Sequence, residues 1–139
     1  MKKLLISLLL GLLATGSACA QNARPFKAYL INNEYEVYLR INLYEQDIEV
    51  PGQELYGQLP GYLGKQHNSF CWVITSAEVN GKQASLTLIN DYGSEDHTAS
   101  HTQKSDSVFI LKQQHGSTLK VPKKGKWQKL PKTLEFRLR

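Results

Sequence analysis

The chain has 139 residues, with 17 lysines and arginines against 12 aspartates and glutamates and only two cysteines. Residues 1–20 carry two of the basic residues and none of the acidic ones, so the rest keeps a net charge of +3. This length suits one domain with an apolar core. Only Cys71 lies beyond residue 20, so a disulfide within residues 21–139 is excluded, and we expect a buried, inert thiol.

The first 20 residues have the pattern of a bacterial secretory signal. Lys2 and Lys3 precede an apolar run over residues 4–14, and small residues follow as far as Ala20. The run is shorter than the roughly 20 apolar residues that span a bilayer. We expect cleavage after Ala20, which divides the chain into a signal peptide, residues 1–20, and a single domain, residues 21–139.

The cysteine at position 19 leaves an alternative open. Lipid attached to Cys19 would anchor the chain to a membrane, whereas simple cleavage would free Gln21. Lipoprotein signals usually carry a leucine-like residue where Gly16 stands, so simple cleavage is the preferred interpretation. We therefore expect an exported protein, periplasmic or secreted, that contacts a membrane only if it is lipidated at Cys19.

From residue 27 onward the sequence alternates as half-buried β-strands do. Within residues 35–44, aliphatic side chains occupy every second position, and polar or aromatic ones lie between them. Residues 83–90, 107–112 and 132–138 read as three more strands. The positions expected to face inward are Val37, Leu39, Ile41 and Leu43, then Ala84, Leu86 and Leu88, and then Leu134, Phe136 and Leu138.

Turn signals separate these runs and predict the fold. Asn32-Asn33 follows the first run, and Asn80-Gly81 suits a type I′ hairpin turn, whose two central residues have positive φ. No window of a dozen residues shows a helical stripe. We expect an all-β chain of about eight to ten strands in a single antiparallel meander. Closure into a small barrel would remove the exposed edges, and a β-sandwich is the alternative.

Three segments carry a resemblance to a family. They are "NEYEVYLRINLYEQDIEVPGQELYG", "VNGKQASLTLIND" and "KGKWQKLPKTLEFRLR", in that order. Together they resemble the opening hairpin, a repeated Gly-x-Leu-x-Leu strand and the closing Gly-x-Trp element of small secreted lipocalin-like barrel domains of bacterial envelopes. The resemblance implies a barrel, a possible cavity for a small hydrophobic ligand, and Trp127 as a plug at one barrel end. It implies no catalytic residues.

The stretch "LINDYGSEDHTASH" gathers carboxylates and two histidines, His97 and His101. Its composition reads as strand, turn and strand, and on a strand positions i and i+4 lie about 13 Å apart, too far to share one metal ion. The acidic residues fit no EF-hand spacing. We therefore expect the solvated tip of a β-hairpin, with no metal site and no cofactor.

Sites for acid–base or nucleophilic chemistry are not indicated. Glu45, Asp47 and Glu49 alternate with Gln46, Ile48 and Val50, which predicts a solvated acidic face of a strand rather than a carboxylate pair. The chain has no Gly-x-Ser-x-Gly elbow, phosphate loop or Cys-His signature. We expect a protein that is not an enzyme.

The C-terminal segment, residues 112–139, is strongly basic. It holds nine basic residues and a single acid, Glu135. An exported protein rarely meets nucleic acid, so an anionic envelope component is the expected partner. The simpler alternative is that the lysines keep a turn soluble and protect a sheet edge. The candidate binding residues here are Lys123, Lys124, Lys126 and Trp127.

Tyrosines supply the remaining candidates. Tyr38 and Tyr44 lie on the face opposite the aliphatic positions of their strand. Exposed rings of this kind can stack on sugars or contact a partner, and they can also simply cover the outer wall of a barrel.

These patterns indicate an exported, non-enzymatic binding domain of the lipocalin-like type, which we expect to be a monomer. Its expected ligand is a small hydrophobic molecule or an anionic envelope component. The alternatives are a secreted protein inhibitor of the lysozyme-inhibitor type and a small hydrolase. Lysozyme is basic, so the net positive charge disfavours the inhibitor.

Overall fold

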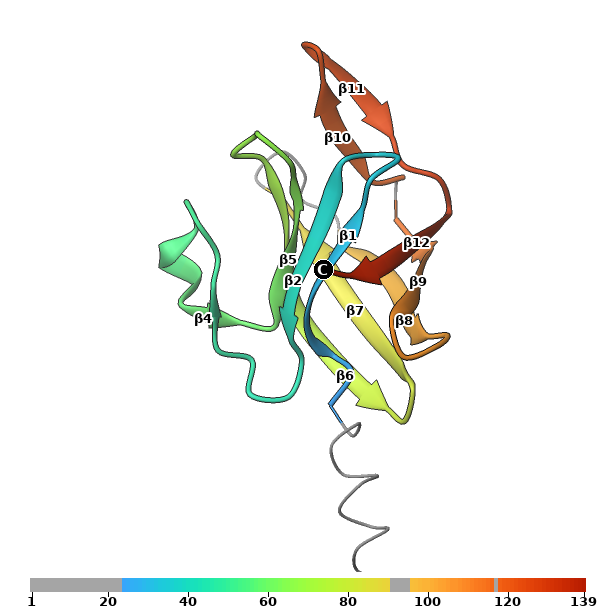
Figure 1. Ribbon diagram of the computed structural model, residues 1–139. Coiled ribbons are helices and arrows are strands. Elements are labelled where there is room, and N and C mark those ends of the chain that lie inside the picture. The colour runs from blue at the N-terminus through green and yellow to red at the C-terminus, as the bar shows by residue number, and fades with distance from the viewer. Residues whose placement is uncertain (1–23, 91–95, 117) are drawn as a thin grey trace, which may run out of the picture.

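The structure, a computed structural model, describes residues 24–90, 96–116 and 118–139. Eight antiparallel strands form a closed barrel, and strands that follow one another around the barrel also do so along the chain (Figure 1). Pairing of the first strand with both the second and the last closes the cylinder. The all-β meander barrel is confirmed and the β-sandwich is excluded. The barrel strands are β1 (Lys27–Asn32), β2 (Val37–Asn42), β5 (Gly61–Lys65), β6 (Cys71–Asn80), β7 (Gln83–Ile89), β8 (His97–Gln103), β9 (Val108–His115) and β12 (Thr133–Leu138).

Two excursions leave the barrel wall. The first contains β3 (Ile48–Glu49), the 3₁₀ turn η1 (Glu54–Tyr56) and β4 (Gln58–Leu59), and it packs on the outside of the wall. The second is the hairpin of β10 (Lys120–Lys123) and β11 (Lys126–Lys129), which projects from one end of the barrel (Figure 1). We call this the hairpin end. The described chain enters at Arg24, at the opposite end.

The alternating pattern places the core as expected. The inward positions of β2 and β7 are buried, as are Leu134 and Phe136 of β12. Leu138 is an exception with 44% exposure, because it is the last residue of its strand, at the rim of the barrel. The inward side chains form one continuous apolar cluster that fills the barrel interior.

Two local predictions need correction. The β6–β7 turn consists of Gly81 and Lys82, because Asn80 is paired with Gln83 as a strand residue, and only the glycine has positive φ. The expected type I′ turn at Asn80-Gly81 is therefore wrong by one position. It follows that the register of the two strands, and not the Asn-Gly pair, sets this turn.

The prediction of an acidic strand over residues 45–49 is also wrong. Strand β2 ends at Asn42, and only residues 48–49 of this stretch form a strand. The buried Asn42 amide accepts hydrogen bonds from the backbone N–H groups of Tyr44 and Glu45 and donates one to Asp47. These bonds create a turn. Glu45 and Asp47 therefore do not share a strand face with Glu49.

Candidate functional site: a lysine hairpin beside an aromatic pocket

The projecting hairpin, β10 and β11 with their connecting residues, is the most strongly charged feature of the molecule, and we call it the lysine hairpin. Lys124 and Gly125 both have positive φ, of 52° and 78°, as a two-residue type I′ turn requires. This backbone is unusual for a lysine, since positive φ disfavours side chains with a Cβ. The turn brings lysines into direct opposition across the strands, Lys120 opposite Lys129 and Lys123 opposite Lys126.

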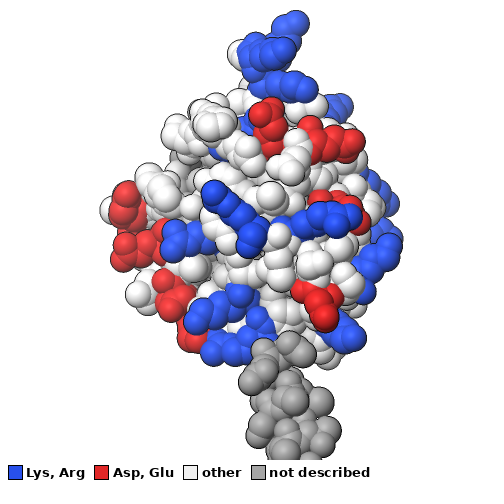
Figure 2. Space-filling model, viewed as in Figure 1, with Lys and Arg blue, Asp and Glu red and all other residues white. Residues whose placement is uncertain are grey.

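Positive charge accumulates on this hairpin without compensation. Like charges directly opposite each other on two strands are destabilising. No acidic residue occurs between residues 107 and 134. In the described part of the chain, the three ion pairs are Arg24–Glu45, Lys65–Glu36 and Arg137–Glu135, so none involves a hairpin lysine. Figure 2 shows the consequence as a projecting tip covered by basic side chains.

The base of the lysine hairpin is held firmly to the barrel. Leu119, Val121 and Leu130 are buried in the main core. The indole Nε1 of Trp72, on β6, donates a hydrogen bond of 2.8 Å to the Lys120 carbonyl. The backbone N–H of Leu130 donates to the Leu119 carbonyl at 2.9 Å. The lysines are therefore presented on an anchored element.

A pocket of about 570 Å³ opens beside the hairpin, and we call it the aromatic pocket. Phe70, from the β5–β6 loop, and Trp127, from β11, meet edge to face there, with ring centroids 5.2 Å apart. Residues of the first excursion and of the barrel wall complete it. The lining residues are Tyr38, Pro51, Gly52, Gln53, Asn68, Ser69, Phe70, Cys71, Asn90, Pro122 and Trp127.

Trp127 does not plug the barrel as the resemblance implied. Its side chain is 53% exposed, whereas Val121, on the facing strand, points into the core. The reason is register: Trp127 pairs with Pro122, and that pair lies on the face of the hairpin opposite to Val121. The indole is therefore available on the outside of the barrel, beside Phe70.

Tyr38 lies on the outer wall and reaches the same pocket. Its ring stacks on Tyr29 at 5.5 Å, meets Tyr62 edge to face, and covers Gly64 on the neighbouring strand. Burial, followed by a hydrogen bond with Tyr62, raises the pKa of the Tyr38 phenol above its ordinary value. Tyr38 is thus a neutral, well-packed part of the pocket wall.

Tyr44 does not belong to this site. Its hydroxyl accepts a hydrogen bond from the backbone N–H of Phe26, and the guanidinium of Arg24 lies 5.0 Å from its ring centroid. Both contacts are at the barrel end opposite to the lysine hairpin. The structure therefore places Tyr38 and Trp127 in one pocket, beside the hairpin that carries the three predicted lysines, and separates Tyr44 from them.

Several pocket residues were not anticipated from the sequence. Phe70 is part of an apolar run that reads only as a strand, and Gln53, Asn68 and Asn90 lie in turns without a motif. Cys71 is half-buried at the pocket and not fully buried as expected. No local signal could have found this set, because its members come from three segments that meet only in the closed barrel.

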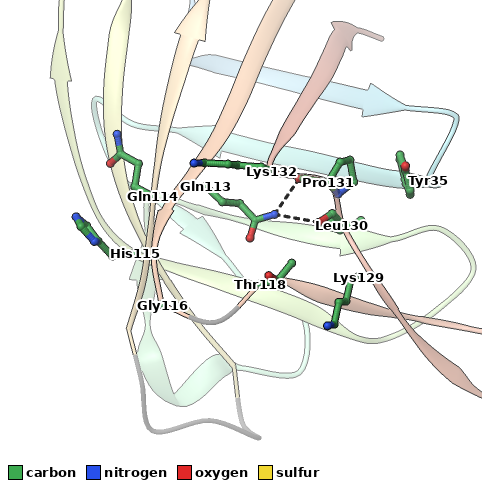
Figure 3. Close-up of a pocket in the computed structure, with 10 residues that line it drawn as sticks. All are labelled: Tyr35, Gln113, Gln114, His115, Gly116, Thr118, Lys129, Leu130, Pro131 and Lys132. Atoms are coloured by element: carbon green, nitrogen blue, oxygen red, sulfur yellow. Dashed lines mark hydrogen bonds between the residues drawn. The ribbon is translucent and has the colours of Figure 1, made fainter.

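A second pocket of about 500 Å³ lies at the base of the hairpin (Figure 3). Its centre is the Gln113 amide, which donates to the carbonyls of Leu130 and Pro131 and accepts from the backbone N–H of Leu119. Lys129 and Lys132 also line it. Since all three hydrogen bonds of Gln113 hold the segment around the hairpin, its amide has a structural role.

The two histidines lie on β8, the strand that returns after the turn, as expected. Leu88 pairs with His97, so the hairpin itself is confirmed, but His97 and His101 are buried on the inner face of β8. The turn residues 91–95 lie outside the described residues. Within the described ranges, no group of three His, Cys, Asp or Glu side chains could hold a metal ion.

Among the described residues, no helix is long and apolar enough to cross a membrane. No protein-family model, curated protein or solved structure matches the chain. Function must therefore be inferred from the lysine hairpin and the aromatic pocket themselves.

Proposed function

We propose that the protein is an exported, monomeric, non-enzymatic binding domain of the lipocalin-like envelope type, and that it binds an anionic envelope component through the lysine hairpin. The observation that carries this proposal is the pairing of Lys120 with Lys129 and of Lys123 with Lys126 on an anchored, projecting element. A bound anion would relieve the repulsion within each pair. Export depends on the signal peptide, residues 1–20, which remains a prediction.

The packed interior favours the outer surface over the barrel centre as the binding site. A small hydrophobic ligand inside the barrel would have to displace buried side chains such as Phe109 and Phe136, which belong to the main core. Close-packed interiors resist such displacement. An outer-surface ligand at the hairpin needs no such rearrangement.

The alternatives have less support. A basic target such as lysozyme needs an acidic surface, but Glu45 is paired with Arg24 and Asp47 accepts a hydrogen bond from Asn42. The hydrogen bond from Arg24 lowers the pKa of the Glu45 carboxyl, so the carboxylate is ionised and its charge already has a partner within the molecule. A hydrolase is less favoured because neither of the two pockets above has an aspartate or glutamate among the described residues that line it.

The geometry also bears on the lipoprotein alternative. The described chain enters the barrel at the end opposite to the lysine hairpin. If Cys19 carried a lipid, the hairpin would point away from the membrane that holds the anchor. The anionic partner would then be a component beyond that membrane surface.

Binding to two polyanions, polyphosphate and oligogalacturonate, tests the proposal by calorimetry at two salt concentrations. The double variant Lys123→Glu/Lys126→Glu should weaken binding by about tenfold or more, and salt should weaken binding to the unmodified protein. The matched control, Lys82→Glu/Lys104→Glu, changes the net charge equally but lies in turns at the opposite end. Equal losses in the two variants, or no binding to either polyanion, would contradict the proposal.

A further inference from the structure

We infer that the aromatic pocket is a subsite for one sugar ring, so that the anionic partner is an acidic polysaccharide whose carboxylates contact the lysine hairpin. This inference rests on the proposed function and specifies its ligand. It is carried by three features of the pocket: its aromatic floor, its polar rim and its position relative to the lysines.

The aromatic floor is a supported platform. Trp72 is buried in the core, and its ring meets Phe70 edge to face at 6.2 Å. Phe70 in turn meets Trp127 at 5.2 Å. This row of rings runs from the barrel core to the half-exposed indole, so the indole is backed by packed groups. A pyranose presents an apolar face of C–H groups, and an exposed aromatic ring with fixed orientation suits that face.

The rim offers the hydrogen-bonding groups that a sugar needs. Side-chain amides of Gln53, Asn68 and Asn90 and the hydroxyl of Ser69 line the pocket. Amides and hydroxyls both donate and accept, as sugar hydroxyls do. The Asn68 side chain also accepts a 2.8 Å hydrogen bond from the backbone N–H of Phe70, which orders the loop that carries the platform. The volume, about 570 Å³, lies within the ~300–1,000 Å³ typical of small-molecule pockets.

The lysines lie where the acidic groups of such a polymer would fall. The cross-strand pair Pro122–Trp127 lines the pocket, and the pair Lys120–Lys129 is two residues further along the same face of the hairpin. Two residues of a strand span about 7 Å. A chain with one ring on Trp127 can therefore bring a neighbouring carboxylate to these lysines. Lys123 and Lys126 form the next pair towards the tip and lie on the opposite face of the hairpin.

A membrane surface fits the same charges less well. A hairpin that enters the interface of a bilayer would carry apolar side chains at its tip. Here the tip consists of Lys123, Lys124, Gly125 and Lys126. The indole of Trp127 instead contacts Phe70 in a concave pocket with a polar rim.

The test compares ligands that share charge and differ in chemistry. The complete mature protein and its Trp127→Ala variant are titrated with hexameric oligogalacturonate and oligomannuronate, with polyphosphate, and with vesicles that contain anionic phospholipid. We expect Trp127→Ala to weaken binding of at least one oligouronate about tenfold and to change binding of polyphosphate less than about twofold. Trp127→Phe, which keeps a ring, should restore most of the affinity. The oligouronate should also change tryptophan fluorescence in the unmodified protein but not in Trp127→Ala.

A second variant tests the subsite independently if Trp127→Ala does not fold. Ser69 is exposed at the pocket, so Ser69→Leu should obstruct the subsite without disturbing the core. We expect it to weaken oligouronate binding selectively as well.

If these variants leave oligouronate binding unchanged, or reduce it no more than polyphosphate binding, the sugar subsite is refuted while the proposed function stands. Binding to vesicles but not to oligouronates would also refute the subsite and would identify a membrane as the anionic partner. Failure to bind any of these anions would refute the proposed function itself.

Discussion

We expect His101, one of the two buried histidines of β8, to make the stability of this barrel depend on pH. His101 is fully buried, and its ring stacks on Phe109 at 5.3 Å and contacts Phe26 and Phe136. Within the described residues, neither ring nitrogen has a hydrogen-bond partner. Burial in these apolar surroundings lowers the pKa of His101 from 6.5 to about 4. The ring is therefore neutral in the folded protein at neutral pH.

The sign and size of the effect follow from this pKa. Between pH 6.5 and about 4, the unfolded chain takes up a proton at His101 that the folded chain does not, so stability is complete above this window and falls as the pH falls through it. One proton corresponds to about 1.4 kcal/mol per pH unit, or about 3 kcal/mol in the free energy of unfolding over the window.

The substitution His101→Leu isolates this contribution. It removes two buried polar atoms without partners, so we expect equal or greater stability at pH 7.5. Urea unfolding at pH 7.5, 5.5 and 4 should show the advantage of the variant growing by about 3 kcal/mol towards the acidic end. A difference between His101→Leu and the unmodified protein that stays constant with pH would refute the reasoning.

Two further predictions concern the wall and the hairpin base. In Gly64→Ala the new methyl group would collide with the ring of Tyr38, so urea unfolding should show a loss of about 1–3 kcal/mol, and a double variant with Tyr38→Ala should lose less than the two single changes together. Gln113→Leu removes three hydrogen bonds of 2.8–3.3 Å, so we expect a loss of about 2–3 kcal/mol and faster hydrogen exchange at the Leu119 amide. The exposed neighbour, in Gln114→Leu, should show neither effect, and equal losses in the two glutamine variants would contradict the hydrogen-bond argument.

Local patterns in the sequence were sufficient to predict the barrel wall. The alternation over residues 37–43 decides which side chains point inward, because successive residues of a strand face opposite sides wherever that strand lies. The same holds for residues 84–88, which are buried as predicted. The strands and the turns between them require no knowledge of distant residues, and closure followed from the need to remove sheet edges.

Features that depend on the pairing between strands were harder to predict from the sequence. The Asn80-Gly81 turn was one residue out of place because Asn80 pairs with Gln83, which leaves Gly81 and Lys82 as the turn. The strand that carries His101 was predicted, but its burial was not, because only the closed barrel decides that this face of β8 points inward.

The sequence by itself determined the fold class, the inward faces of the strands and the basic character of the C-terminal segment. Only the tertiary structure decided that Trp127 lies outside the barrel beside Phe70, that Tyr38 joins them and that Tyr44 does not. The physical reason is the separation along the chain of the residues that create each feature. Alternation and charge are properties of a few consecutive residues, whereas a pocket between segments that are 57 positions apart exists only after every strand of the barrel has found its register.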